Sequence, residues 1–299
     1  MNKNSKTGIC LLLTLLSIGI GQMHAQKDKG FPKIASPGLN PVILGASEFE
    51  LNFFYNVQRF PEVYRQDAPY NLTNFEQRTQ QGQMQLTFGL SDESNVNLGI
   101  DLGYSYIETS LKNTRQNPFE IGPHANLGPR VRWEPFPKLF SKSSSLFLQH
   151  KLLIPLVESK VKFVDTLSIV NQMVFSQRLG YSFLLQAEVG AIFSPAVSIA
   201  GRTSSKRPIT TPASLYLGFI ATSRWVLYGS LNYIPEFSEV PWFEDGNRYR
   251  RRAGTHAGGG IQFIFSQRLS FFASYQGILD AEFGGAANSL TFSVRFSNQ

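Results

Sequence analysis

The side chains best suited to chemistry in this sequence are charged residues at alternate positions of segments that are otherwise apolar at every second residue. Arg130 and Arg132 project from the same face of an extended strand, and Lys151 falls on that face in the next predicted strand. This face could attract an anion or hold ion pairs. Its predicted charged members are Glu48, Glu50, Asp101, Arg130, Arg132, Glu134, Lys151, Glu188 and Arg295.

Two interpretations of this charged face are open. In the first, the residues line a lumen that admits polar or charged solutes. In the second, ion pairs between them fill a closed interior, with Asp101 neutralising part of the Arg130 and Arg132 charge. Closure of the chain would place Arg295 beside Glu48 and Glu50, and that contact would be structural.

The elements that position these residues follow one pattern, shown best by residues 81–106. Met84, Leu86 and Phe88 fall on one face, while Gln83 and Gln85 fall on the other, and the alternation resumes after a short polar turn. Side chains of a strand alternate between its faces, so this segment predicts a long two-faced β-hairpin. Strands of about ten residues cross a bilayer at a tilt of about 45°.

The rest of the chain repeats this unit, and long connections alternate with short ones. The pattern predicts an all-β fold, a closed antiparallel transmembrane β-barrel of about twelve strands with both termini periplasmic and the long loops external. The predicted strands are 48–58, 81–90, 96–106, 126–134, 145–154, 167–177, 181–192, 213–222, 225–234, 255–265, 269–278 and 290–296.

The N-terminal region differs from this pattern. Residues 1–25 have two lysines before a short apolar core, which predicts a secretory signal peptide. Residues 26–46 are proline-containing and without period, and we expect a periplasmic extension or partial plug; residues 47–299 form the barrel. Without Lys3 and Lys6, 28 − 2 = 26 basic residues face 21 acidic ones, a net charge of +5. This balance is too weak to indicate a nucleic-acid partner.

The chain resembles the Gram-negative outer-membrane β-barrels, most specifically in its last strand, Leu290-Thr-Phe-Ser-Val-Arg-Phe296. Such barrels end in an alternating strand with a terminal aromatic residue, although here three residues follow Phe296. The resemblance implies an outer-membrane location, contact with lipids and lipopolysaccharide, and recognition by the barrel-assembly machinery. In the style of Leu86-Thr-Phe-Gly-Leu-Ser-Asp92, the chain is also similar to outer-membrane transporter barrels of the phenol-degradation-associated type.

Two further groups of residues have side chains that could carry chemistry. Arg248, Arg250, Arg251 and Arg252 form a predicted external basic loop that would bind an anion or a lipopolysaccharide phosphate, or be simply solvated. The histidines after the signal are His124, His150 and His256, and His150 falls on the lipid-facing side. No serine has the surroundings of an outer-membrane lipase. We therefore predict no catalytic residue, no metal and no cofactor.

Three functions follow from these observations. The first is a channel or transporter for small polar or anionic solutes, which we expect. The second is a structural, adhesive or assembly barrel that acts through its external loops. The third is a lipid-modifying outer-membrane enzyme. The N-terminal extension bears on this choice, because a segment folded into the lumen would oppose passive diffusion.

Overall fold

The computed structural model of the chain describes residues 43–60, 75–91, 95–111, 119–137, 143–156, 167–195, 198–199, 202–203, 209–239, 249–281 and 287–298. The predicted signal peptide and most of the predicted extension lie outside these residues. No helix of the described residues is long and apolar enough to cross a membrane.

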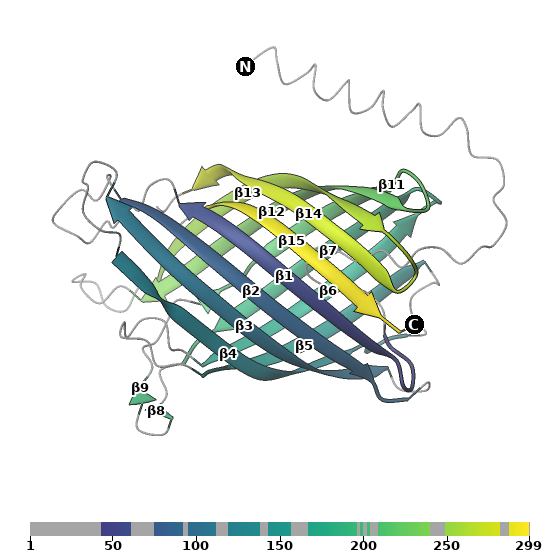
Figure 1. The fold of residues 1–299 in the computed structure, drawn as a ribbon, viewed down its shortest axis with the longest axis horizontal. Coiled ribbons are helices and arrows are strands. Elements are labelled where there is room, and N and C mark those ends of the chain that lie inside the picture. Colours follow the sequence, from purple (N-terminus) through teal and green to yellow (C-terminus); the bar gives the residue numbers. More distant parts are fainter. Residues whose placement is uncertain are drawn as a thin grey trace, which may run out of the picture. The chain divides into compact units, whose positions relative to one another are not determined.

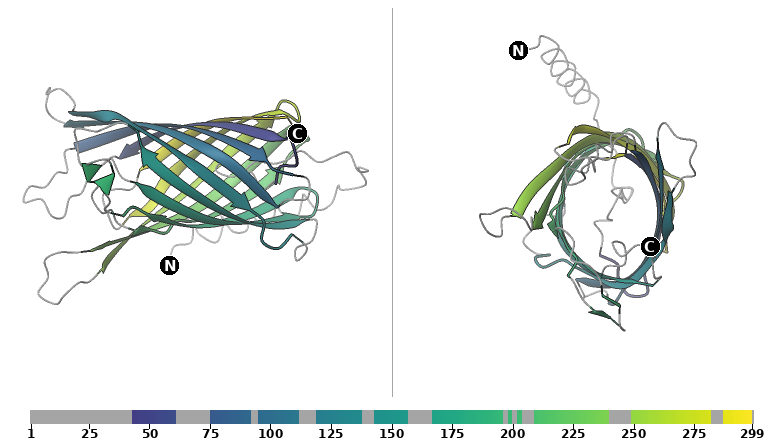
Figure 2. Two further views of the ribbon diagram at one scale, coloured as in Figure 1. Left: turned by 90° about the horizontal axis from the view of Figure 1, so that it is seen from below. Right: turned by 90° about the vertical axis from the view of Figure 1, so that its left-hand side faces the viewer.

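The strands form one antiparallel sheet that closes on itself, seen as a ring in Figure 2. The sheet counts 13 strands, but β10 and β11 both lie between β7 and β12 and fill one place in the wall, so 13 − 1 = 12 strands close the barrel. The barrel strands are β1 (Phe49–Phe60), β2 (Phe75–Gly89), β3 (Val96–Leu111), β4 (Phe119–Trp133), β5 (Ser144–Pro155), β6 (Ser168–Leu179), β7 (Phe183–Phe193), β10 (Ile209–Thr210), β11 (Ala213–Ile220), β12 (Trp225–Glu239), β13 (Tyr249–Ile264), β14 (Leu269–Ala281) and β15 (Asn288–Ser297). A separate short pair, β8 (Ser198–Ile199) and β9 (Arg202–Thr203), lies between β7 and β10 in the sequence.

The first and last strands complete the barrel (Figure 1). β1 pairs with β15 from Glu50 opposite Ser297 to Arg59 opposite Asn288. The Asn298 side chain accepts a hydrogen bond from the Phe49 backbone and donates one to the Ser47 carbonyl oxygen. The start of β1 and the end of β15 therefore lie at the same end of the barrel. This end also holds the short connections and is here called the turn end. The opposite end is called the loop end.

The predicted alternation of faces is confirmed. Phe53, Leu98 and Phe292 are exposed on the outer wall, whereas Gln85 and Arg130, on the opposite parity, are buried. An apolar outer face and a buried polar inner face follow from this arrangement. Exposed aromatic side chains lie near the two ends of the wall, as expected for residues at membrane interfaces: Trp133, Phe136, Tyr181, Trp225, Phe265 and Phe296 at the turn end, and Tyr55 and Tyr104 toward the loop end.

Several strands run further at the loop end than predicted. β2 begins at Phe75, β4 begins at Phe119 and β13 begins at Tyr249. Arg250, Arg251 and Arg252 are therefore in β13, paired with Ser238, Phe237 and Glu236 of β12, and not in a loop. Apolar residues are required at every second position of a barrel strand only where its outer face contacts lipid. The parts of β2, β4 and β13 that extend beyond the bilayer therefore lack the alternation from which strands were predicted.

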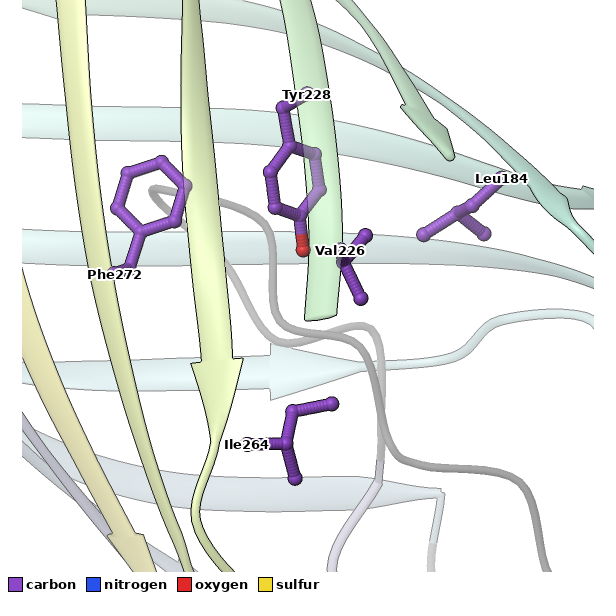
Figure 3. Packing of buried hydrophobic residues seen from close by; sticks show 5 residues of the cluster. All are labelled: Leu184, Val226, Tyr228, Ile264 and Phe272. Atoms are coloured by element: carbon purple, nitrogen blue, oxygen red, sulfur yellow. The ribbon is translucent and has the colours of Figure 1, made fainter. Parts of the chain in front are cut away.

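Part of the inner wall is apolar, which the sequence reading did not predict. Leu184, Val226, Tyr228, Ile264 and Phe272 form a buried cluster contributed by β7, β12, β13 and β14 (Figure 3). The rings of Tyr228 and Phe272 meet edge to face with centroids 5.5 Å apart. This cluster is here called the apolar sector of the inner wall, although buried polar side chains such as Gln262 lie on the same strands. The buried charged residues Glu50, Asp101, Arg130, Arg132 and Arg295, on strands β15, β1, β3 and β4, form the charged sector together with Lys151 of β5.

Candidate functional site in the lumen

The centre of the charged sector is Asp101 on β3. One carboxylate oxygen lies 3.1 Å from Nζ of Lys151, and the other lies 3.4 Å from Nε of Arg130. Arg130 and Lys151 are direct register partners on β4 and β5, and Asp101 is opposite Gly128 of β4. The predicted proximity of Arg130 and Lys151 is confirmed. The contacts of Asp101 are those of the second interpretation, in which a single carboxylate faces two cations.

Arg130 is further held by neutral groups of β2. It donates hydrogen bonds to Oε1 of Gln85 over 2.8 Å and to Oγ1 of Thr87 over 2.5 Å. Its side chain is fully buried. These contacts fix the guanidinium group against the wall without adding negative charge.

Arg132 extends the charged sector toward the turn end. It contacts Oε1 of Gln149 at 3.4 Å, and Gln149 in turn donates to Oε1 of Gln172 over 2.8 Å. Arg132 also lies within electrostatic range of Glu50, Arg130, Asp101 and Arg295. The predicted patch formed by Arg130, Arg132 and Lys151 is therefore continuous with the seam where the barrel closes.

At that seam, Arg295 of β15 donates from Nε to Oε2 of Glu50 over 2.8 Å. The second Glu50 oxygen accepts a hydrogen bond from Nδ2 of Asn52 over 2.7 Å. The predicted contact between Arg295 and Glu50 is confirmed. Within the described part of the chain, the ion pairs of this cluster join Arg130 and Lys151 to Asp101 and Arg295 to Glu50. With Arg132, whose electrostatic neighbours include Glu50 and Asp101, these residues comprise four cations and two carboxylates, a difference of 4 − 2 = +2.

The other predicted charged residues lie apart from this cluster. Glu48 is in the turn before β1, where its carboxylate accepts a hydrogen bond from the Gly45 backbone over 2.9 Å. Glu134 follows the last residue of β4, and partial burial raises the pKa of its carboxyl. Glu188, on β7, accepts from Nε2 of Gln186 over 2.6 Å. Arg248 lies outside the described residues, as do the side chains of Arg250, Arg251 and Arg252.

The structure adds a feature that sequence reasoning missed, a docked segment just before β1. Leu44 is almost fully buried, and its backbone N–H and C=O both pair with the side-chain amide of Asn97 at 3.0 Å. Ile43 packs on Phe147 and Val174, two apolar residues of the inner wall. Gly89, the last residue of β2, lies so close to this segment that a Cβ atom added to it would be 1.9 Å from the Gly45 carbonyl oxygen. This docking segment, Ile43–Gly45, therefore lies inside the turn end of the barrel.

A metal centre finds no support in the described ranges, where no three His, Cys, Asp or Glu side chains are grouped to hold an ion. Arginine, lysine and amide side chains dominate the site. Such groups bind anions through charge-assisted hydrogen bonds.

Comparison with solved structures identifies the fold. The COG4313 outer membrane channel from Pseudomonas putida F1 superimposes with a TM-score of 0.65 at 13% identity, over 88% of this chain and 100% of that one. The fold is that of a Gram-negative outer-membrane β-barrel. The β domain of the Bordetella autotransporter BrkA superimposes with a TM-score of 0.54 at 14% identity, over 84% of this chain and 99% of that one.

Comparisons of sequence add nothing to this fold assignment, since no family model and no curated protein matches the chain. The outer-membrane location predicted from the sequence agrees with that of the COG4313 outer membrane channel.

Proposed function

We propose that the protein is an outer-membrane channel for small anionic solutes. The observation that carries the proposal is the excess of cations over carboxylates in the buried cluster around Asp101. A barrel interior of low dielectric strengthens the field of such charges relative to water. The positive potential in the lumen would lower the electrostatic energy of an entering anion and raise that of a cation of the same size.

The docking segment bears on how such a channel would open. Ile43–Gly45 lies at the turn end and adds backbone and apolar side chains to the interior. We infer that passage requires this segment to move, so the described arrangement is the closed one. The apolar sector of the inner wall would then contact any apolar part of a solute whose charged group is held by Arg130, Arg132 and Lys151.

A second candidate is a structural or assembly barrel that does not conduct. It is favoured by the burial of Asp101 and Arg130 and by the polar contacts that fix Arg130 to β2. In this alternative the ion pairs seal the interior, and the remaining positive charge is a cost offset elsewhere in the fold.

The double variant Arg130→Ser and Arg132→Ser separates the two candidates. The measurement is the reversal potential of the purified barrel in planar bilayers across a salt gradient. We expect the anion-to-cation permeability ratio to fall severalfold, since a change of about 1.4 kcal/mol already alters a partition equilibrium tenfold. The matched control is Arg224→Ser with Arg268→Ser, which removes two exposed cations from turns and should leave the ratio close to that of the wild type.

Folding of each variant is checked by the shift in gel mobility between unheated and boiled samples. If the wild type does not conduct and the lumen variant fails to fold, the cluster is structural and the channel function is wrong. An unchanged permeability ratio in a folded, conducting variant would also contradict the proposal.

A further inference from the structure

A polar pair lies on the outer, lipid-facing wall of the barrel, where apolar residues are expected. Nδ1 of His150 on β5 lies 2.7 Å from Oδ1 of Asn171 on β6, its direct register partner. Both side chains are exposed and alternate with the buried Gln149 and Val170, so they project outward. The pair is thus unrelated to the charged cluster of the lumen.

The surroundings of the pair are apolar on every side. Along β5, Leu148 precedes His150 and Leu152 follows it, and along β6 the corresponding neighbours are Ile169 and Met173. Val131 of β4 and Ala191 of β7 continue the row on either side. Three further outward apolar positions lie beyond, at Leu146, Ile154 and Leu156, so the pair lies within the apolar band of the outer wall.

The outward nitrogens of the pair are not used within the described part of the chain. Asn171 Oδ1 can only accept, so Nδ1 of His150 donates to it, and in the neutral imidazole Nε2 is then an acceptor. Nδ2 of Asn171 is a donor. In hydrocarbon, a donor and an acceptor without partners cost free energy, because no water is present to satisfy them.

We propose that this face is where two copies of the chain pair in the membrane. A donor and an acceptor side by side are self-complementary under two-fold symmetry. An axis along the membrane normal places each Asn171 amide opposite the other copy's His150 Nε2, which gives two intermolecular hydrogen bonds. The apolar residues around the pair then pack against their symmetry mates, and both polar groups leave the lipid.

The test uses the full chain in proteoliposomes, with Met173→Cys as a reporter beside the pair and a short bismaleimide as the crosslinker. The only native cysteine, Cys10, lies in the predicted signal peptide. Phe292→Cys on β15 is the matched reporter, because β14 and β15 lie across the barrel from β5 and β6. We expect crosslinked dimers from the first reporter and none above random collision from the second.

The variants His150→Leu and Asn171→Leu, each in the Met173→Cys background, then test the hydrogen bonds. Loss of both intermolecular bonds should raise the dimer dissociation constant about tenfold, which corresponds to about 1.4 kcal/mol. The control Gln80→Leu removes a different outward hydrogen bond, the one donated by Tyr55, and should leave dimerisation unchanged.

Three results would overturn the proposal. They are equal crosslinking from both reporters, crosslinking that survives both leucine variants, and a crosslinked product whose mass is that of a different protein. Folding is not an ambiguity, because leucine at an outward position removes a polar group from lipid, and gel mobility confirms the barrel in each variant.

Discussion

The contact between Glu50 and Arg295 shows what a single residue does in this fold. The two side chains are buried, and their ion pair joins β1 to β15, the first barrel strand to the last. These two strands are neighbours in the barrel although no loop connects one directly to the other. A charged group left in a buried site after its partner is neutralised is strongly destabilising, whereas an intact pair contributes little beyond an apolar substitute. Glu50 therefore matters chiefly because Arg295 is present.

The variant Glu50→Gln tests this coupling. We expect the free energy of unfolding to fall by about 3–5 kcal/mol, measured by urea titration in lipid vesicles with unheated gel mobility as the readout. The double variant with Arg295→Met should recover part of the loss, because the Arg295 charge is no longer left in the barrel without its carboxylate. Simple addition of the two single effects would show that the residues act independently.

At this scale, the alternation correctly predicted that Glu50, Asp101, Arg130, Arg132 and Arg295 face inward, whereas Glu48 lies in the turn before β1. It did not predict how the charged residues divide among partners. Parity alone placed Asp101, Arg130 and Lys151 on one face, since the side-chain period of a strand is two. The distances depend on the register between β3, β4 and β5, which parity does not determine. For the same reason, the contact of one carboxylate with both cations was only one of two alternatives.

The docking segment is the main feature at the scale of elements. Its only signal in the sequence was a proline-containing stretch without period, which indicates irregular structure but no location. The contacts that hold it are a backbone-to-amide pairing with Asn97 and the close approach of Gly45 to Gly89. Neither contact has a periodic sequence signature.

The variant Gly89→Ala should release this segment. A Cβ atom at residue 89 would lie 1.9 Å from the Gly45 carbonyl oxygen, so backbone must move. With a cysteine in place of the buried Leu44, we expect the rate of labelling by a water-soluble maleimide to rise at least tenfold, equivalent to about 1.4 kcal/mol of lost docking. Gly82→Ala is the control in the same strand, because nothing lies within 4 Å of its added Cβ. Equal labelling in both variants would mean that Gly89 does not hold the segment.

Strand β6 illustrates where periodicity loses information. Its alternation was the weakest in the chain, and the structure gives the reason: Val170 and Val174 face inward while Asn171 faces outward. Each of these residues reverses the usual chemistry of its face. Departures from the alternation of apolar and polar residues therefore occur where the inner wall is apolar and where the outward polar pair lies. The sequence alone does not distinguish such departures from an irregular strand.

For the whole molecule, closure determines the topology. An even number of antiparallel strands returns the chain to the end where it began, and here Asn298 contacts Ser47 and Phe49. Bacterial outer-membrane barrels have short periplasmic turns and long external loops. The turn end, which holds the short connection Phe265–Arg268 between β13 and β14, is therefore predicted to face the periplasm.

Surface labelling of intact cells tests this orientation. Epitope tags inserted at Asp67, between β1 and β2 in the sequence, and at Lys160, between β5 and β6, should be bound by antibody without permeabilisation. Tags at Arg178 and Gln267, at the turn end, should be bound only after the outer membrane is opened. The contrast should be close to all-or-none, because an antibody cannot cross an intact bilayer. The opposite pattern would invert the barrel and place the docking segment, the closure pair Glu50–Arg295 and the C-terminus at the cell surface.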